Sequence, residues 1–173
     1  MKKLYLPQPD EKTGIIPQFD GYFDLKEIDL SVYKNASVVG TVFHDYSGED
    51  VQGMQAGKQA DIVELLYQME DITTPDNKAK NYVYYEARTL HDSSLSKAIH
   101  SITACDLGME KEAYDMFMSA ALTDLGQEMK SSDAGIHSAN MGGVWQDVVM
   151  GFGGIRIRDG HLRIAPNCPK QWE

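Results

Sequence analysis

The chain has 173 residues and a formal net charge of −10, because 26 acidic residues outnumber 16 basic ones. A chain of this length supports one hydrophobic core, and its acidic surface repels a nucleic-acid backbone, so we expect no nucleic-acid partner. The only cysteines, Cys105 and Cys168, lack disulfide-framework or zinc-ligand spacing, so the sequence predicts a reducing compartment and no metal site.

Residues 1–45 are rich in proline, glycine and aspartate, and their short apolar pieces show no sustained helical period. We expect this segment to be extended or irregular and to cover another part of the molecule, since structureless segments of this length are uncommon in compact domains. The first 14 residues lack the apolar run of a signal peptide, and no apolar run in the sequence is long enough to cross a bilayer. These features predict a soluble, cytoplasmic protein with no membrane partner.

From about Ser47 onward, apolar residues recur at helical spacing and predict five helices. Thr74 and Pro75 supply a cap and a first-turn proline, whereas Gly108 and Gly126 supply C-terminal stops. The predicted helices span residues 54–70, 75–87, 93–108, 109–126 and 135–154. Short connections between them predict antiparallel helix pairs.

Residues 154–164 change to a strand pattern, with isoleucine and leucine alternating with polar residues on either side of Asp159-Gly160. An Asp-Gly pair between such runs is a strong signal for a β-hairpin. The sequence therefore predicts a mainly α-helical region over residues 1–154 and a β-hairpin region over residues 155–173. Because a lone hairpin is marginally stable in water, we expect this one to have a neighbour.

A cluster of polar residues lies before the third predicted helix, in the stretch RTLHDSSLSKAIHS. Asp92 or Ser93 could cap that helix, because first-turn N–H groups have no partner inside a helix. The same N–H groups, together with the hydroxyls of Ser93, Ser94 and Ser96, could instead bind an anion. Both interpretations stay open at this point.

Two further places could take part in binding. Lys58 and Gln59 stand together at the start of an otherwise apolar and acidic helical pattern, where they are either solvated side chains or donors to a sugar or a phosphate. His137 lies near a predicted helix start, followed by Gly142-Gly143 and Trp145, and is either a structural histidine or a ligand-binding one. None of these residues indicates a particular function by itself.

Four stretches follow one another in the chain: LPQPDEKTGIIPQFDGYFDL, GKQADIV, YYEARTLHDSSLSKAIHSI and MKSSDAGIHSANMGGVWQDVVMGFGGIRIRDGHLRIAP. Together they resemble glycoside hydrolase family 65, the inverting phosphorylases of maltose, trehalose, kojibiose, nigerose and related α-glucosides. The resemblance implies the second half of an (α/α)₆ toroid, with the hairpin as the first strands of a β-sandwich. It also implies that inorganic phosphate is the co-substrate, that no other cofactor is needed, and that β-glucose 1-phosphate is the product.

The resemblance also suggests residue roles. Lys58 and Gln59 match the pair that holds glucose, Ser93 and Ser94 match the phosphate-binding serine loop, and His137 matches the histidine that faces the phosphate. Gln18 and Asp20 match a segment near the active site.

The family's general acid lies in a stretch resembling GPDEYH, which these 173 residues do not contain. Five acidic residues could be substitutes, but each is better interpreted as a helix-face charge, a cap or a loop residue: Glu49, Asp61, Glu64, Glu86 and Asp92. No catalytic residue is therefore predicted, and we expect negligible activity from this chain alone. Three alternatives stay open. The chain is part of a phosphorylase, with a companion chain or as a homodimer, or it is a degenerate sugar-phosphate binding module, or it is a structural or interaction domain.

Overall fold

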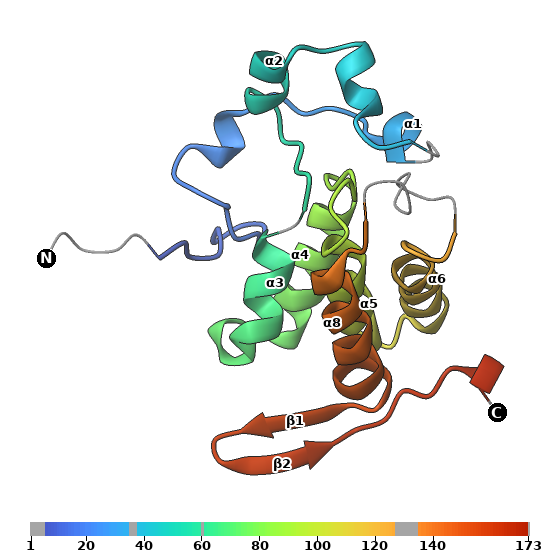
Figure 1. Ribbon diagram of the computed structural model, residues 1–173. Coiled ribbons are helices and arrows are strands. Elements are labelled where there is room, and N and C mark those ends of the chain that lie inside the picture. The colour runs from blue at the N-terminus through green and yellow to red at the C-terminus, as the bar shows by residue number, and fades with distance from the viewer. Residues whose placement is uncertain (1–5, 35–37, 60, 127–134, 173) are drawn as a thin grey trace, which may run out of the picture. The chain divides into compact units, whose positions relative to one another are not determined.

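The computed structural model describes residues 6–34, 38–59, 61–126 and 135–172. The described residues are mainly helical and end in a two-stranded antiparallel hairpin (Figure 1), which confirms the predicted fold class. The chain divides into a first unit of residues 1–35 and 41–90 and a second unit of residues 36–40 and 91–173. In the described part of the chain, no helix has both the length and the apolar character that a membrane span requires.

The helices of the first unit are short except for the last. They are α1 (Ser31–Lys34), α2 (Gly48–Gln52), α3 (Asp61–Gln68) and α4 (Pro75–Glu86), with 3-10 turns at Tyr22–Asp24, Thr41–His44 and Glu70–Ile72. The hydroxyl of Thr74 accepts the N–H of Asn77 at 3.2 Å, and Pro75 occupies the first turn of α4. The cap and the first-turn proline predicted for this helix are confirmed.

The helix predicted over residues 54–70 is wrong in its first half. The preceding helix, α2, ends at Gln52, and α3 begins only at Asp61. Between them Gly57 forms a parallel bridge with Thr89, donating its N–H to the carbonyl of Arg88 and accepting the N–H of Leu90, each at 2.8 Å. These non-local bonds hold the backbone extended, which a helical period in the sequence does not reveal.

The irregular N-terminal segment is ordered by side chains of α4. The amide of Asn81 accepts the N–H of Ile16 and donates to the carbonyl of Gly14, both at 2.8 Å. The hydroxyl of Tyr85 donates to the carbonyl of Ile16, and Asn81, Tyr85 and Ile16 are buried. The stretch at Gly14–Ile16 therefore packs on α4, which satisfies these backbone groups, whereas the segment predicted as irregular also contains the short helix α1 and two 3-10 turns.

In the second unit, α5 is the buried central helix. It spans Ser96–Asp106 and contacts α6 (Glu110–Ala121), α8 (Ser138–Gln146) and the π-helix η5 (Asp147–Phe152). The Ser101 hydroxyl donates to the Ala113 carbonyl, and the Lys97 ammonium donates to the Ser119 hydroxyl, so α5 and α6 run antiparallel. Gly108, with φ of 71°, follows the end of α5 as predicted.

The fourth predicted helix ends earlier than expected. It stops at Ala121 instead of continuing toward Gly126, because the Ala120 carbonyl is bound by the Asn140 side chain at 2.8 Å and by the Thr123 N–H at 3.2 Å. The side chain of Asn140 comes from α8 and therefore replaces a helical bond that the sequence of α6 alone would favour.

The C-terminal hairpin joins β1 (Ile155–Arg158) and β2 (His161–Ile164), with Arg158 opposite His161. Asp159 and Gly160 both have positive φ, 50° and 74°, as a two-residue hairpin turn requires. The hairpin is anchored by buried Arg156, whose guanidinium lies 3.1 Å from a carboxylate oxygen of Asp106. The hairpin prediction is confirmed, and the region boundary predicted between Gly154 and Ile155 stays a prediction.

Candidate functional site

The serine cluster lies in the loop that leads into α5. Ser93 is buried and Ser94 is half-buried, and the Ser96 N–H donates to the Ser93 carbonyl at 3.1 Å. The N-cap residue is Leu95, so neither Asp92 nor Ser93 is the N-cap, but the Ser93 hydroxyl accepts the N–H of Leu95 at 3.4 Å. The N–H groups of Leu95 and Ser96 therefore both go to Ser93, which folds the serine loop tightly onto the start of α5.

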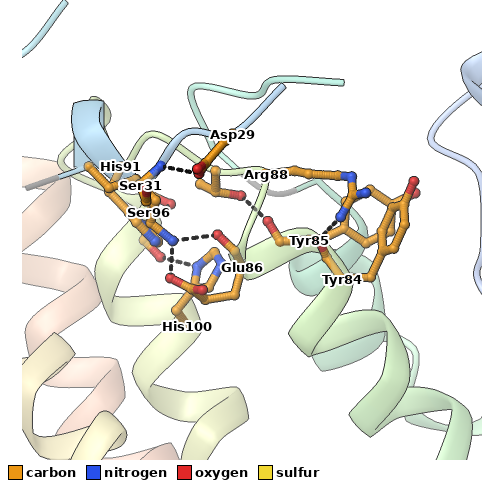
Figure 2. A network of polar contacts seen from close by, with 11 residues as sticks. Asp29, Ser31, Tyr84, Tyr85, Glu86, Arg88, His91, Ser96 and His100 are labelled. Carbon is orange, nitrogen blue, oxygen red and sulfur yellow. Dashed lines mark hydrogen bonds and ion pairs between the residues drawn. The ribbon is translucent and has the colours of Figure 1, made fainter. Parts of the chain in front are cut away.

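Asp92 and His91, at the N-terminal end of this loop, make other contacts. The Asp92 carboxylate accepts the N–H of Gly40 at 3.0 Å, which explains why it does not cap α5. His91 Nδ1 lies 3.0 Å from the hydroxyl of Ser96, and its ring meets that of His100 edge to face with centroids 4.6 Å apart. Figure 2 shows the side chains of His91, Ser96 and His100 close together.

The backbone of the loop is shaped by His91, which has a φ of 57°. This left-handed conformation costs a non-glycine residue about 1 to 2 kcal/mol and persists only where surrounding contacts enforce it. Here the buried contacts with Ser96 and His100 enforce it. The serine loop is therefore a shaped and anchored segment.

His137 lies at the start of α8, whose direction decides which residues it can approach. A Cβ at Gly143 would lie 3.1 Å from the Ala98 side chain, and a Cβ at Gly151 would lie 3.4 Å from the backbone of Ile102. Both pairs advance together along the chain, so α8 and η5 run parallel to α5, beside which α8 lies in Figure 1. His137 and the serine loop therefore belong to the same end of the two helices.

The ring of His137 is held by Asp124, a residue that the sequence analysis missed. One carboxylate oxygen lies 2.8 Å from ring Nδ1, and the other accepts the backbone N–H of His137 at 3.0 Å. The Asp124 side chain is 7% exposed and that of His137 is 30% exposed. One sequence signal could have found it: Asp124 follows the C-terminal end of a helix, where the helix dipole disfavours an anion.

Lys58 and Gln59 belong to the first unit and are both exposed. The prediction that they stand at the beginning of a helix is wrong. They lie in the loop before α3, directly after Gly57, whose backbone is bonded to residues just after α4. A Cβ at Gly57 would approach the Gln59 carbonyl to 3.0 Å, so the tight bend at this position favours glycine. The loop thus presents two neighbouring polar side chains from a fixed backbone.

The acidic residues rejected as general acids have structural contacts in the described part of the chain. Glu86 forms an ion pair with Lys34, and Glu64 accepts the side-chain amide of Gln68 at 2.8 Å. Glu49 and Asp61 lie in the first turns of α2 and α3, where the helix dipole favours a negative charge. These contacts agree with the interpretation that none of the five carboxylates is a proton donor.

The neighbouring arginine of the RTLHDSS stretch is also fully engaged. The guanidinium of Arg88 lies over the ring of Tyr84, 3.8 Å from its centroid, and contacts Gln55 and Glu27 at 3.1 and 2.9 Å (Figure 2 shows Arg88 against Tyr84). This network lies within the first unit and orders the end of α4. Arg88 is therefore a structural residue of that unit.

Comparison with known proteins gives a consistent result over the whole chain. Residues 1–146 match the model of the glycosyl hydrolase family 65 central catalytic domain. The chain is 47% identical to kojibiose phosphorylase of Halothermothrix orenii over 99% of its length, and 40% identical to that of Escherichia coli over all of it. It covers only 22% and 23% of those two proteins.

A solved structure is similar as well. It is described as a putative kojibiose phosphorylase from human microbiome, with a TM-score of 0.85 and 32% sequence identity. The match covers 96% of this chain and 24% of the solved one. The similarity therefore concerns about a quarter of a larger protein.

Proposed function

Because the chain belongs to glycosyl hydrolase family 65, we propose that it forms the phosphate- and glucose-binding part of an inverting disaccharide phosphorylase. The observation that carries the proposal is the common end of the parallel helices α5 and α8, where the loop with Ser93 and Ser94 leads into α5 and His137 precedes α8. First-turn N–H groups, hydroxyls and an imidazole are groups that bind phosphate oxygens.

In the proposed reaction, an oxygen of inorganic phosphate attacks the anomeric carbon of an α-glucoside disaccharide. The bond from that carbon to the bridging oxygen breaks, and a carboxylic acid donates the proton that the leaving sugar takes up, which gives β-glucose 1-phosphate. Phosphate stands where an inverting hydrolase holds an activated water. The serine loop and His137 orient the phosphate, while Lys58 and Gln59 hold the glucose hydroxyls.

Phosphate binding tests this proposal directly. In isothermal titration with inorganic phosphate and with β-glucose 1-phosphate, we expect binding by the 173-residue chain. Ser94→Ala and His137→Ala should each weaken it by about tenfold or more, because each removes a hydrogen bond to a charged ligand. His161→Ala is the matched control, since this histidine is exposed on β2. Equal affinities in all four proteins would contradict the assignment.

Catalysis should be negligible in the isolated chain. General acid catalysis contributes about 10² to 10⁴ to a rate, and none of the 173 residues matches the family's acid. We expect no β-glucose 1-phosphate above background from kojibiose and phosphate. Phosphate-dependent release that Lys58→Ala abolishes would contradict this. The partner we propose is a companion chain that carries the acid, and its addition should restore turnover, whereas a homodimer of the 173-residue chain would supply no acid.

The exposed pair Lys58 and Gln59 and the serine loop would also serve a second candidate function, a sugar-phosphate binding module without catalysis. It shares the binding residues of the first proposal but predicts no turnover under any condition. Binding of β-glucose 1-phosphate, combined with no turnover after the acid-bearing region is supplied, would favour the binding module.

A further inference from the structure

Asp124 contacts His137 with both of its carboxylate oxygens. Oδ1 lies 2.8 Å from ring Nδ1, and Oδ2 accepts the backbone N–H at 3.0 Å. The two bonds fix the ring and the backbone of one residue at the same time. The carboxylate is 7% exposed, so water competes little for these bonds.

The position of Asp124 is not explained by the helix that precedes it. The helix α6 ends at Ala121, and its C-terminal end carries a partial negative charge that disfavours a nearby carboxylate. In the described part of the chain, the bonds that offset this cost go to His137, 13 residues away in sequence. Stabilisation of α6 therefore does not account for the carboxylate.

An ionised carboxylate only accepts hydrogen bonds, so the Nδ1 atom facing Asp124 must carry a proton. The other ring nitrogen, Nε2, is then the one left for a ligand, and the His137 side chain is 30% exposed. Nε2 accepts a hydrogen bond from a P–OH group when the ring is neutral, and donates one to a phosphate oxygen when the ring is charged. Both forms bind phosphate through the same atom.

We propose that Asp124 is a positioning residue that holds His137 in the Nδ1–H form with Nε2 directed to the ligand. This inference deepens the proposed function and rests on it for the identity of the ligand. Asp124 acts through His137 and does not itself contact phosphate. Asp124 follows the end of α6 and His137 precedes the start of α8, and both belong to the same unit.

The test combines nitrogen NMR of the histidine rings with titration of inorganic phosphate, using the full 173-residue chain. The His137 signals are assigned by their loss in His137→Ala, since the chain has five histidines. In the wild type we expect protonated Nδ1. In Asp124→Asn we expect the ring to populate both tautomers and the phosphate affinity to fall by about tenfold. Asp115→Asn is the matched control, an exposed carboxylate on α6 that pairs with Lys111.

The NMR and titration results together test the role of Asp124 separately from the proposed phosphate binding. An unprotonated Nδ1 in the wild type overturns the role of Asp124, and this readout does not depend on the Asp124→Asn variant. Unchanged tautomers in Asp124→Asn, or changed tautomers with unchanged phosphate affinity, also overturn it. If the tautomers change as expected but the wild type binds no phosphate, Asp124 still fixes the ring and the proposed function is wrong.

Discussion

The Asp147→Asn variant should be more stable than the wild type above neutral pH, with an advantage that grows as pH rises from about 4 to about 7. Asp147 is fully buried in the first turn of η5, and among the described residues neither of its carboxylate oxygens has a hydrogen-bond partner. Burial raises the pKa of this carboxyl from 3.8 to about 7, an effect that the nearby Ser101 hydroxyl only partly opposes. That hydroxyl donates to the Ala113 carbonyl instead.

The sign follows from where each state releases its proton. The Asp147 carboxyl loses its proton at about pH 3.8 in the unfolded chain, whereas in the folded chain it keeps its proton until about pH 7. Between these values the unfolded state binds fewer protons, so the free energy of unfolding falls as pH rises, by about 1.4 kcal/mol per pH unit. The total loss is about 4 kcal/mol and levels off above pH 7. An asparagine does not titrate and escapes this loss.

Urea unfolding at pH 4, 5.5, 7 and 8.5 measures the effect. We compare the difference in unfolding free energy between Asp147→Asn and the wild type, because other titrating groups are common to both proteins. Asp159→Asn, at the exposed hairpin turn, is the control and should show no such pH dependence. A difference that stays constant from pH 4 to 8.5 would mean that Asp147 is ionised in the folded protein.

Gly154→Ala should destabilise the second unit by about 3 kcal/mol or more. A Cβ at Gly154 would lie 1.8 Å from the carbonyl oxygen and 2.3 Å from the carbonyl carbon of Ala165. The clash is with backbone, which cannot rotate away as a side chain can. Gly154 also accepts the Ala165 N–H at 3.1 Å, and its φ is 59°. The added methyl group therefore separates the two ends of the hairpin.

Gly160→Ala provides the matched control, because this glycine also has a positive φ but no atom lies within 4 Å of an added Cβ. It should cost about 1 to 2 kcal/mol from backbone strain alone. Trp172 reports the difference, since its ring packs on Phe117 and Phe152 at 5.4 and 4.8 Å between centroids. We expect a red shift of its emission in Gly154→Ala only. Equal stabilities and spectra would contradict the predicted clash.

The sequence predicts local structure well where local chemistry decides it. The cap at Thr74, the stop at Gly108 and the turn at Asp159 depend on neighbouring residues, and all three are confirmed. The errors arise where a distant residue takes over a backbone group. Backbone bonds to Arg88 and Leu90 hold Gly57 extended in a segment with a helical period, and Asn140 takes the carbonyl that would continue α6.

For the candidate site, too, the sequence predicted some features and missed others. The sequence by itself determined the family and the residue types of the site, because the long stretches around Lys58, Ser93 and His137 carry the resemblance, and the family match confirms it. The roles of those residues stay proposals. Asp124 was missed because it is separated from His137 in sequence and has no motif of its own.

Only the tertiary structure decided which side chains meet. The parallel run of α8 along α5 depends on glycines that let the helices approach, and a sequence does not give the direction in which two separated helices pack. Likewise, Asp147 reads as an ordinary helix-face charge until packing removes all water from it. Residue chemistry is local and is written in the sequence, whereas burial and partner choice arise from contacts between distant segments, which form only when the chain folds.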